Sequence, residues 1–156
     1  MSIHGIANVC SQLVNCSMAR GALVSIPYTK LHLAIMLGLY RHGVVSAVNL
    51  GGQYGPHLTP QAIETEPVSS RRLWITLKYK DGTPVLKNAG LVMASKDFFE
   101  MKRFELVALL HGATVKRMRP IAPGELLFIK TDKGILEGRE AAAIGRGGQA
   151  LCRFST

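Results

Sequence analysis

The stretch from residue 130 to residue 148 holds the side chains best suited to bind a charged ligand. Thr131 brings a hydroxyl that can donate or accept a hydrogen bond, and Lys133 brings an ammonium that acts as a point charge toward phosphate. Gly134 and the pair Gly147–Gly148 lack side chains, which lets another backbone approach closely. These residue types predict recognition of an anionic backbone rather than bond-breaking chemistry.

Short elements are expected to position these groups. The apolar run Leu126–Ile129 predicts a buried strand, and residues 131–134 have the composition of a tight turn. Glu137 to Ile144 suits a short helix with three successive alanines, ending at Gly145. Gln149–Phe154 is expected to return as the last strand.

Three acidic residues lie in this stretch. Asp132 would repel phosphate, so we expect it to fold back and brace the turn through a local backbone bond. Glu137 and Glu140 are one helical turn apart, and they are expected to flank Arg139 as a surface pair rather than to catalyse a reaction.

The charge balance indicates the class of partner. Nineteen Lys and Arg stand against ten Asp and Glu, giving a net charge of +9 and a pI near 9.8. No long basic tail exists, so the positive surface must be built by folding. This favours a polyanionic partner, nucleic acid before membrane, and no apolar run approaches the ~18 residues of a membrane span.

The sequence argues against an enzyme or a metalloprotein. The five histidines are scattered, and the three cysteines (Cys10, Cys16 and Cys152) form no CxxC pair and are expected to be buried. No cofactor, metal or small-molecule substrate is predicted. The alternative is a small nucleotide-binding enzyme that cradles phosphate with Gly145–Gly148, although a tight turn accounts for the same glycines.

Hydrophobic periodicity predicts the remaining elements. In the first half it gives helices at 3–18 and 30–42, the second capped by Thr29, and strands at 22–26, 44–50 and 73–79. A long Pro-containing connection is expected within 51–70. The second half is expected to have strands at 91–95 and 98–101, a helix at 103–111 with Leu106, Val107, Leu109 and Leu110 inward, and a basic cluster at 116–120. The fold class is α+β with two small lobes: an N-terminal α-β-α-β-β lobe, residues 1–84, and a strand-rich C-terminal lobe with short helices, residues 85–156.

The segment 130–149 resembles the C-terminal signature of the small-subunit ribosomal protein S8 family. The chain has KTDKG at 130–134 where the family has STSKG, and EGREA at 137–141 where it has a short helix with an Arg. It has GRGGQ at 145–149 where the family has GLGGE. Near the front, IPYTKL at 26–31 resembles the family's MPSSKLK. The resemblance covers most of the chain and is weakest at 51–70 and 112–124, which look like insertions.

The resemblance implies a structural protein of the small ribosomal subunit. Such a protein would bind the central domain of small-subunit rRNA, beside neighbouring ribosomal proteins, and support assembly and translation. The Arg-rich face of the family's first helix falls here near Gln12 and Val14, with Asn15 retained. Carried over by position, the expected RNA-binding residues are Asn15, Thr29, Lys30, Lys130, Thr131, Asp132, Lys133, Gly134, Arg146, Gly148 and Gln149.

The expected compartment is the mitochondrial matrix, within the mitochondrial ribosome. The first acidic residue is Glu64, and an acid-poor front is compatible with import. A bacterial cytoplasmic ribosome is the alternative location, and a free-standing RNA-binding regulator is the alternative function.

Overall fold

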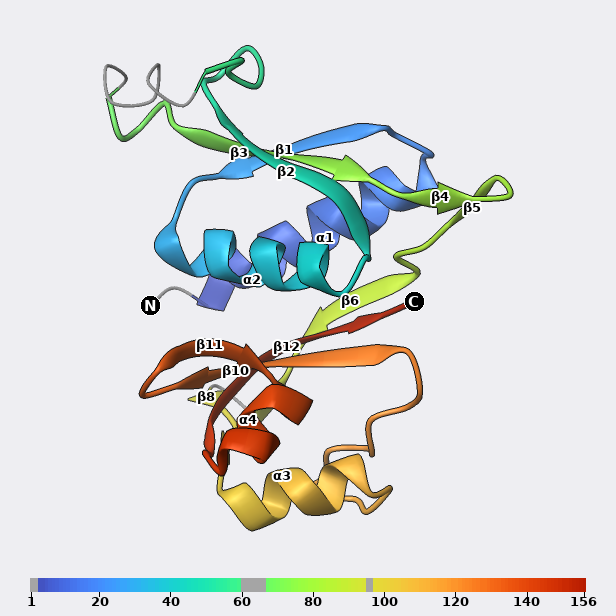
Figure 1. The fold of residues 1–156 in the computed structure, drawn as a ribbon, viewed down its shortest axis with the longest axis vertical. Coiled ribbons are helices and arrows are strands. Elements are labelled where there is room, and N and C mark those ends of the chain that lie inside the picture. The colour runs from blue at the N-terminus through green and yellow to red at the C-terminus, as the bar shows by residue number, and fades with distance from the viewer. Residues whose placement is uncertain (1–2, 60–66, 95–96) are drawn as a thin grey trace. The chain divides into compact units, whose positions relative to one another are not determined.

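The protein has the predicted α+β composition and divides into two compact units (Figure 1). A computed structural model describes residues 3–59, 67–94 and 97–156. One unit runs from residue 8 to residue 87. The other contains residues 88–156 together with the beginning of the first helix.

The first unit is built on a three-stranded antiparallel sheet in the order β1-β3-β2. Its elements follow the predicted α-β-α-β-β order and end in a small hairpin. They are α1 (Ile3–Met18), β1 (Leu23–Pro27), α2 (Lys30–Arg41), β2 (Val45–Gly51), β3 (Arg72–Leu77), β4 (Tyr79–Lys80) and β5 (Thr83–Pro84).

Helix α2 begins directly after Thr29, the N-cap residue predicted from the sequence. The Thr29 hydroxyl accepts a hydrogen bond from the backbone N–H of His32 at 3.0 Å, which satisfies a donor at the helix start. Ile35 and Leu39 are buried as expected. His32 is buried as well, and its Nδ1 lies 2.9 Å from the carbonyl oxygen of Pro27. The helix is therefore fixed to the end of the strand before it.

The first part of the 51–70 connection bonds back onto the sheet. Gly51 and Pro56 form a β-bridge, the N–H of His57 donates to the Leu50 carbonyl, and the Trp74 indole N–H donates to Gly52 at 3.0 Å. The expected excursion is thus anchored at its start, and residues 60–66 lie outside the described part of the chain.

The second unit contains a five-stranded antiparallel sheet. Its order is β11-β10-β12-β6, and β9 pairs with the free half of the β12 edge. The strands are β6 (Asn88–Leu91), β9 (Glu100–Met101), β10 (Glu125–Thr131), β11 (Gly134–Glu137) and β12 (Gly148–Ser155); β7 (Met93–Ala94) pairs with β8 (Asp97–Phe98), and the helices are α3 (Arg103–Leu110) and α4 (Gly138–Ile144).

Some predicted elements are corrected. The two strands expected at 91–95 and 98–101 are four short ones, with Ser95 outside the described residues. Strand β11 was not predicted, because its four residues begin at a turn glycine, Gly134, and lack a clear period. In α3, Leu106 and Leu109 are fully buried, whereas Val107 is 36% exposed rather than inward.

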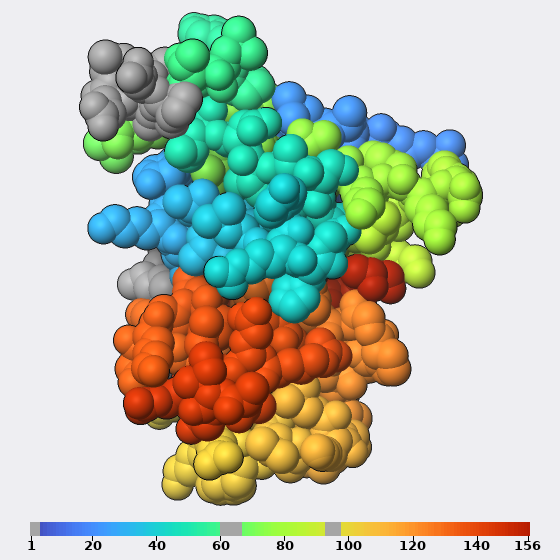
Figure 2. Space-filling model, viewed as in Figure 1, coloured from blue at the N-terminus to red at the C-terminus, as the bar shows by residue number. Residues whose placement is uncertain are grey.

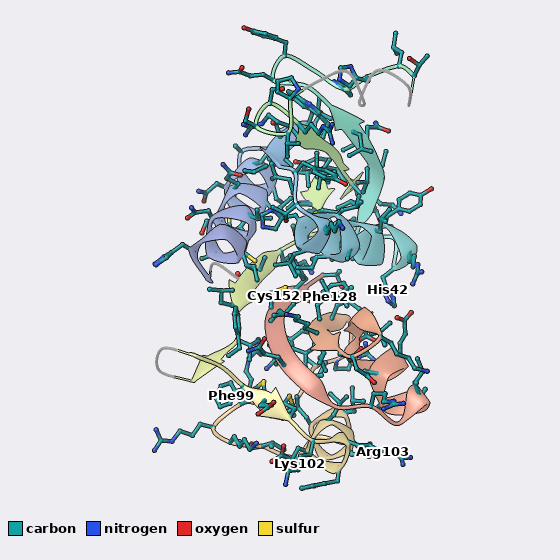
Figure 3. All side chains as sticks on the ribbon, turned by 90° about the vertical axis from the view of Figure 1, so that its left-hand side faces the viewer. His42, Phe99, Lys102, Arg103, Phe128 and Cys152 are labelled. Atoms are coloured by element: carbon teal, nitrogen blue, oxygen red, sulfur yellow. The ribbon has the colours of Figure 1, made fainter. Side chains whose placement is uncertain are left out.

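The two faces of the larger sheet carry different side chains. Leu127 and Ile129 belong to a core that also contains Leu106 and Leu109 of α3 and Ala141 of α4. The opposite face carries the edge-to-face rings of Phe128 and Phe154, with centroids 5.7 Å apart, and buried Cys152 (Figure 3).

A bulge interrupts the pairing of β10 with β12. Phe128 pairs with Cys152, but the next residue, Ile129, pairs with Ala150. Strand β12 therefore contains one extra residue, Leu151, at this point. The bulge lies between the two ends of β12.

Candidate nucleic-acid interface

The turn between β10 and β11 is held by Thr131. Thr131 pairs with Gly134 across the hairpin, so Asp132 and Lys133 are the two turn residues. The Thr131 hydroxyl donates to the Gly134 carbonyl at 2.8 Å and accepts from the Lys133 N–H at 3.2 Å. Thr131 is buried, so its hydroxyl braces the turn, a task that the sequence assigned to Asp132.

Asp132 is paired with Arg146 instead. The Arg146 guanidinium lies 3.1 Å from the Asp132 carboxylate, and both side chains are about half exposed. The pair joins the turn to the loop before β12 and neutralises the one acid at the tip. Asp132 therefore links the β10–β11 turn to the loop before β12 through its side chain, rather than bracing the turn through a local backbone bond.

The glycine loop, residues 145–148, owes its glycines to the backbone around it. Gly145 ends α4 with a left-handed φ of 77°. A Cβ on Gly147 would overlap the carbonyl oxygen of Met101, and one on Gly148 would overlap that of Lys130. These two glycines make room for neighbouring strands, which corrects the expectation that their missing side chains admit a ligand.

Gly134 differs from the loop glycines. Its φ is 113°, which L side chains rarely adopt, and a Cβ there would meet nothing within 4 Å. Lys130 and Lys133 are both exposed near it. The hairpin tip is thus an open, cationic turn, and with α4 it forms a continuous part of the surface of this unit (Figure 2, orange to red).

Two further cations lie against the glycine loop, and sequence reasoning missed them. Lys102 and Arg103 lie at the start of α3 (Figure 3). The Arg103 guanidinium carbon is 3.4 Å from the Cβ position of Gly145, and Lys102 lines a hollow of about 400 Å³ with Gly147 and Gly148. The sequence did contain a signal for this pair, because Lys102 and Arg103 are two adjacent basic residues at the start of the helix predicted at 103–111.

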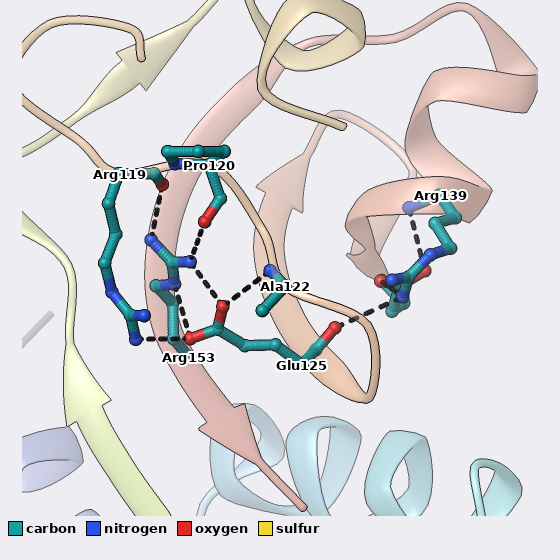
Figure 4. Close-up of polar contacts among 7 residues, drawn as sticks. Arg119, Pro120, Ala122, Glu125, Arg139 and Arg153 are labelled. Carbon is teal, nitrogen blue, oxygen red and sulfur yellow. Dashed lines mark hydrogen bonds and ion pairs between the residues drawn. The ribbon is translucent and has the colours of Figure 1, made fainter. Parts of the chain in front are cut away.

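Glu137 pairs with Arg139 as expected, but it is a buried acid rather than a surface one. Its carboxylate accepts from the Arg139 backbone N–H at 2.7 Å and from the Arg139 guanidinium at 3.1 Å, and Glu137 is 2% exposed. Arg139 also donates to the carbonyl oxygen of Glu125 at 3.2 Å (Figure 4). Arg139 is therefore a brace between α4 and β10.

A second ionic cluster surrounds Glu125 (Figure 4). Arg153 donates to both carboxylate oxygens, at 3.1 and 2.5 Å, Arg119 donates at 2.7 Å, and the Ala122 N–H donates at 3.0 Å. Burial acts to raise the pKa of Glu125, but the Arg153 and Ala122 hydrogen bonds and the charges of Arg153 and Arg119 outweigh it and leave the pKa lowered. The carboxylate is thus ionised at neutral pH and holds the loop before β10.

The expected residues of the first unit occupy separate places. Asn15 is exposed on α1, Thr29 caps α2, and Lys30 is exposed in the first turn of α2. Within the C-terminal unit, Gln149 is half-buried and pairs with Lys130 and Glu100 in the sheet. The structure thus brings together the C-terminal candidates from Lys130 to Gln149.

The described part of the chain holds no candidate metal site. Residues 3–59, 67–94 and 97–156 contain no group of three or more His, Cys, Asp or Glu that could hold a metal ion. No described helix combines the length and apolarity needed to cross a bilayer.

Comparison with known proteins identifies the family. The family model described as ribosomal protein S8 matches residues 4–154. The chain belongs to the ribosomal protein S8 family. A protein named small ribosomal subunit protein uS8m from Neurospora crassa is 40% identical, over 98% of this chain and 99% of its own length.

More distant S8 relatives match over nearly the same span. The uS8m protein of Schizosaccharomyces pombe is 31% identical over 93% of this chain and 95% of its own length. The uS8 protein of the bacterium Dictyoglomus thermophilum is 24% identical, over 94% of this chain and 93% of its own length. The S8 resemblance seen in the segments 26–31 and 130–149 therefore extends over residues 4–154, and the two uS8m relatives are more similar to this chain than the bacterial one is.

Proposed function

We propose that this chain is a structural component of the small subunit of a mitochondrial ribosome. The S8 family and the two uS8m relatives support the ribosomal role and the mitochondrial location. The finer expectations, the matrix compartment and the central domain of the rRNA, belong to the same proposal.

The C-terminal unit is proposed to bind helical rRNA through the hairpin tip and the glycine loop. Exposed Lys130 and Lys133, with Lys102 and Arg103 nearby along the loop, are the observation on which this rests. Double-stranded RNA displays phosphates and 2′-hydroxyls across a shallow minor groove, so a rigid cationic edge can bind it by shape. Gly134 leaves the tip open to that backbone.

The remaining expected residues have supporting roles in this proposal. Thr131, Gly148 and Gln149 hold the tip and the loop in place, and Arg146 offsets the charge of Asp132. Asn15, Thr29 and Lys30 would add contacts from the first unit, with Lys30 and the free N–H groups of α2 meeting a phosphate.

Sedimentation tests the proposal. Tagged protein in a mitochondrial extract should sediment with the small subunit and shift with it when Mg²⁺ is removed. Recovery only in the light fractions would favour a free regulator and overturn the ribosomal role. The nucleotide-enzyme alternative has little support, since the Gly147 and Gly148 Cβ directions are filled by the chain's own backbone.

A further inference from the structure

A cationic hollow lies in the C-terminal unit, among residues other than those proposed for rRNA. Its volume is about 300 Å³, and we call it the arginine hollow. Its lining includes Gly90, Phe99, Arg117, Met118, Arg119 and Arg153.

Gly90 leaves open space in the lining of the hollow. Gly90 pairs with Arg153 of β12, and a Cβ added at Gly90 would meet nothing within 4 Å. A β-branched residue, which suits a strand, would fit the backbone here and fill this space. Packing within the unit therefore does not require a glycine at position 90.

The charges around the hollow are unbalanced. Glu125 is the one carboxylate in its lining, and Arg153 already gives it two hydrogen bonds. Arg119 gives one hydrogen bond to Glu125 and is 69% exposed. Arg117 is exposed and forms no ion pair with another described residue, so the rim has cationic groups available for an anion.

A strained turn presents Arg117. Lys116 and Arg117 have φ values of 46° and 68°, in the left-handed region that normally favours Gly or Asn. Val115 and Met118 exchange backbone hydrogen bonds of 3.1 and 2.7 Å on either side, and Met118 is buried. Lys116 is tied to Glu105 at 3.0 Å. Strain of this kind concentrates at sites that bind.

Beside the hollow, the outer edge of β6 is unpaired among the described strands. Val92, which follows β6, donates its N–H to Leu151 of the β12 side at 3.0 Å. Because alternate residues of an antiparallel strand bond on the same side, Leu91 and Ala89 direct their N–H and C=O groups outward. This edge can accept one more strand.

We propose that the arginine hollow and the β6 edge bind an extended acidic peptide segment of a neighbouring protein. The segment pairs with Ala89 and Leu91, places an apolar side chain against Phe99 and Met118, and sets a carboxylate on Arg117 and Arg119. A peptide fits better than RNA, because a sugar-phosphate chain cannot complete a β-ladder. The neighbour is a ribosomal one if the proposed function holds, but the binding itself does not depend on it.

The test uses the purified full-length chain and an array of overlapping 12-residue peptides that cover the small-subunit proteins of the same organism. Acidic peptides with alternating apolar residues should bind. Arg117→Glu should lower their signal roughly tenfold, since it reverses the rim charge and removes a charge-assisted hydrogen bond. Gly90→Val should abolish it without lowering the thermal unfolding temperature. Lys80→Glu, the same charge change on the exposed β4 strand, should leave it unchanged.

Several results would overturn the proposal. The first is that no acidic peptide on the array binds. The second is that peptide binding survives both Gly90→Val and Arg117→Glu. The third is that these variants lose affinity for an rRNA fragment and keep their affinity for peptides. The last outcome would assign the hollow to RNA. Sedimentation of the wild-type protein tests the ribosomal role separately, so the two failures are distinguishable.

Discussion

Asp132 and Arg146 form a 3.1 Å ion pair that joins the β10–β11 turn to the loop before β12. The pair fastens two segments that are both proposed to face RNA, and it removes a negative charge from the tip. Since both side chains are about half exposed, its direct contribution to stability is expected to be below about 1 kcal/mol. We expect the ion pair to affect the affinity for RNA more than the free energy of unfolding.

The Asp132–Arg146 pair can be tested by comparing a single and a double variant in binding to an rRNA fragment. Arg146→Ala should weaken binding, because it removes a cation and also exposes an unneutralised carboxylate beside phosphates. The double variant Asp132→Ala, Arg146→Ala should recover part of that affinity. Equal affinities for the single and double variants would show that Arg146 contacts RNA independently of Asp132.

Lys133→Ala should weaken RNA binding, because it removes an ammonium that neutralises phosphate. In filter-binding titrations, the slope of log K against log salt should flatten by about 0.7–0.9 for each phosphate that is no longer neutralised. Lys80→Ala removes the same charge from the exposed β4 hairpin of the first unit and serves as the control. An unaltered slope for Lys133→Ala would argue that this ammonium does not meet phosphate.

Gly148→Ala should destabilise the C-terminal unit. The new Cβ would overlap the carbonyl oxygen of Lys130, which belongs to a paired strand and cannot move cheaply. We expect a loss of about 1–3 kcal/mol in the free energy of unfolding, measured in urea. Gly90→Ala is the matched control, because its Cβ has open space. Equal stability of the two variants would contradict the packing role of the loop.

Glu125→Gln should cost about 3 kcal/mol of unfolding free energy at neutral pH, because it leaves Arg153 nearly buried without its charge partner. Glu140→Gln, the same change on half-buried Glu140 of α4, should cost far less.

The pH dependence of that loss follows from the lowered pKa of Glu125. The ionised carboxylate gives its full contribution above the ordinary value of 4.5 and loses it as the pH falls through the lower folded pKa. The stability gap between wild type and Glu125→Gln should therefore narrow below pH 4.5, as read from urea unfolding at several pH values. A gap that stays constant on acidification would mean that the carboxylate charge is not what stabilises the cluster.

Local signals predicted local structure well. Thr29 and Gly145 mark helix ends through bonds and backbone angles that depend on adjacent residues alone, and both were correctly placed. The fold class and the first unit's element order followed from periodicity in the same way. Strand β11 was missed because four residues are too few to show a period.

Interactions between distant residues were not predictable from the chain. Arg153 and Glu125 are 28 residues apart, and nothing in either neighbourhood indicates that they meet. Glu137 looked like a surface acid because its burial depends on β10 pairing with β11. The packing role of Gly147 and Gly148 likewise depends on the strands beside them. For the site, the sequence indicated the segment but not what each side chain does there.

The extra residue in β12 has a consequence for both ends of that strand. With Leu151 present, Ala150 and Arg153 lie on the same side of the sheet although three positions separate them, so one face serves both the core and the ionic cluster. Deleting Leu151 would leave two positions between Ala150 and Arg153, so strict alternation would keep both on this side, and the Arg153 guanidinium would still reach Glu125. The strand can thus carry one residue more than a regular ladder needs, and both of its ends keep their partners on β10.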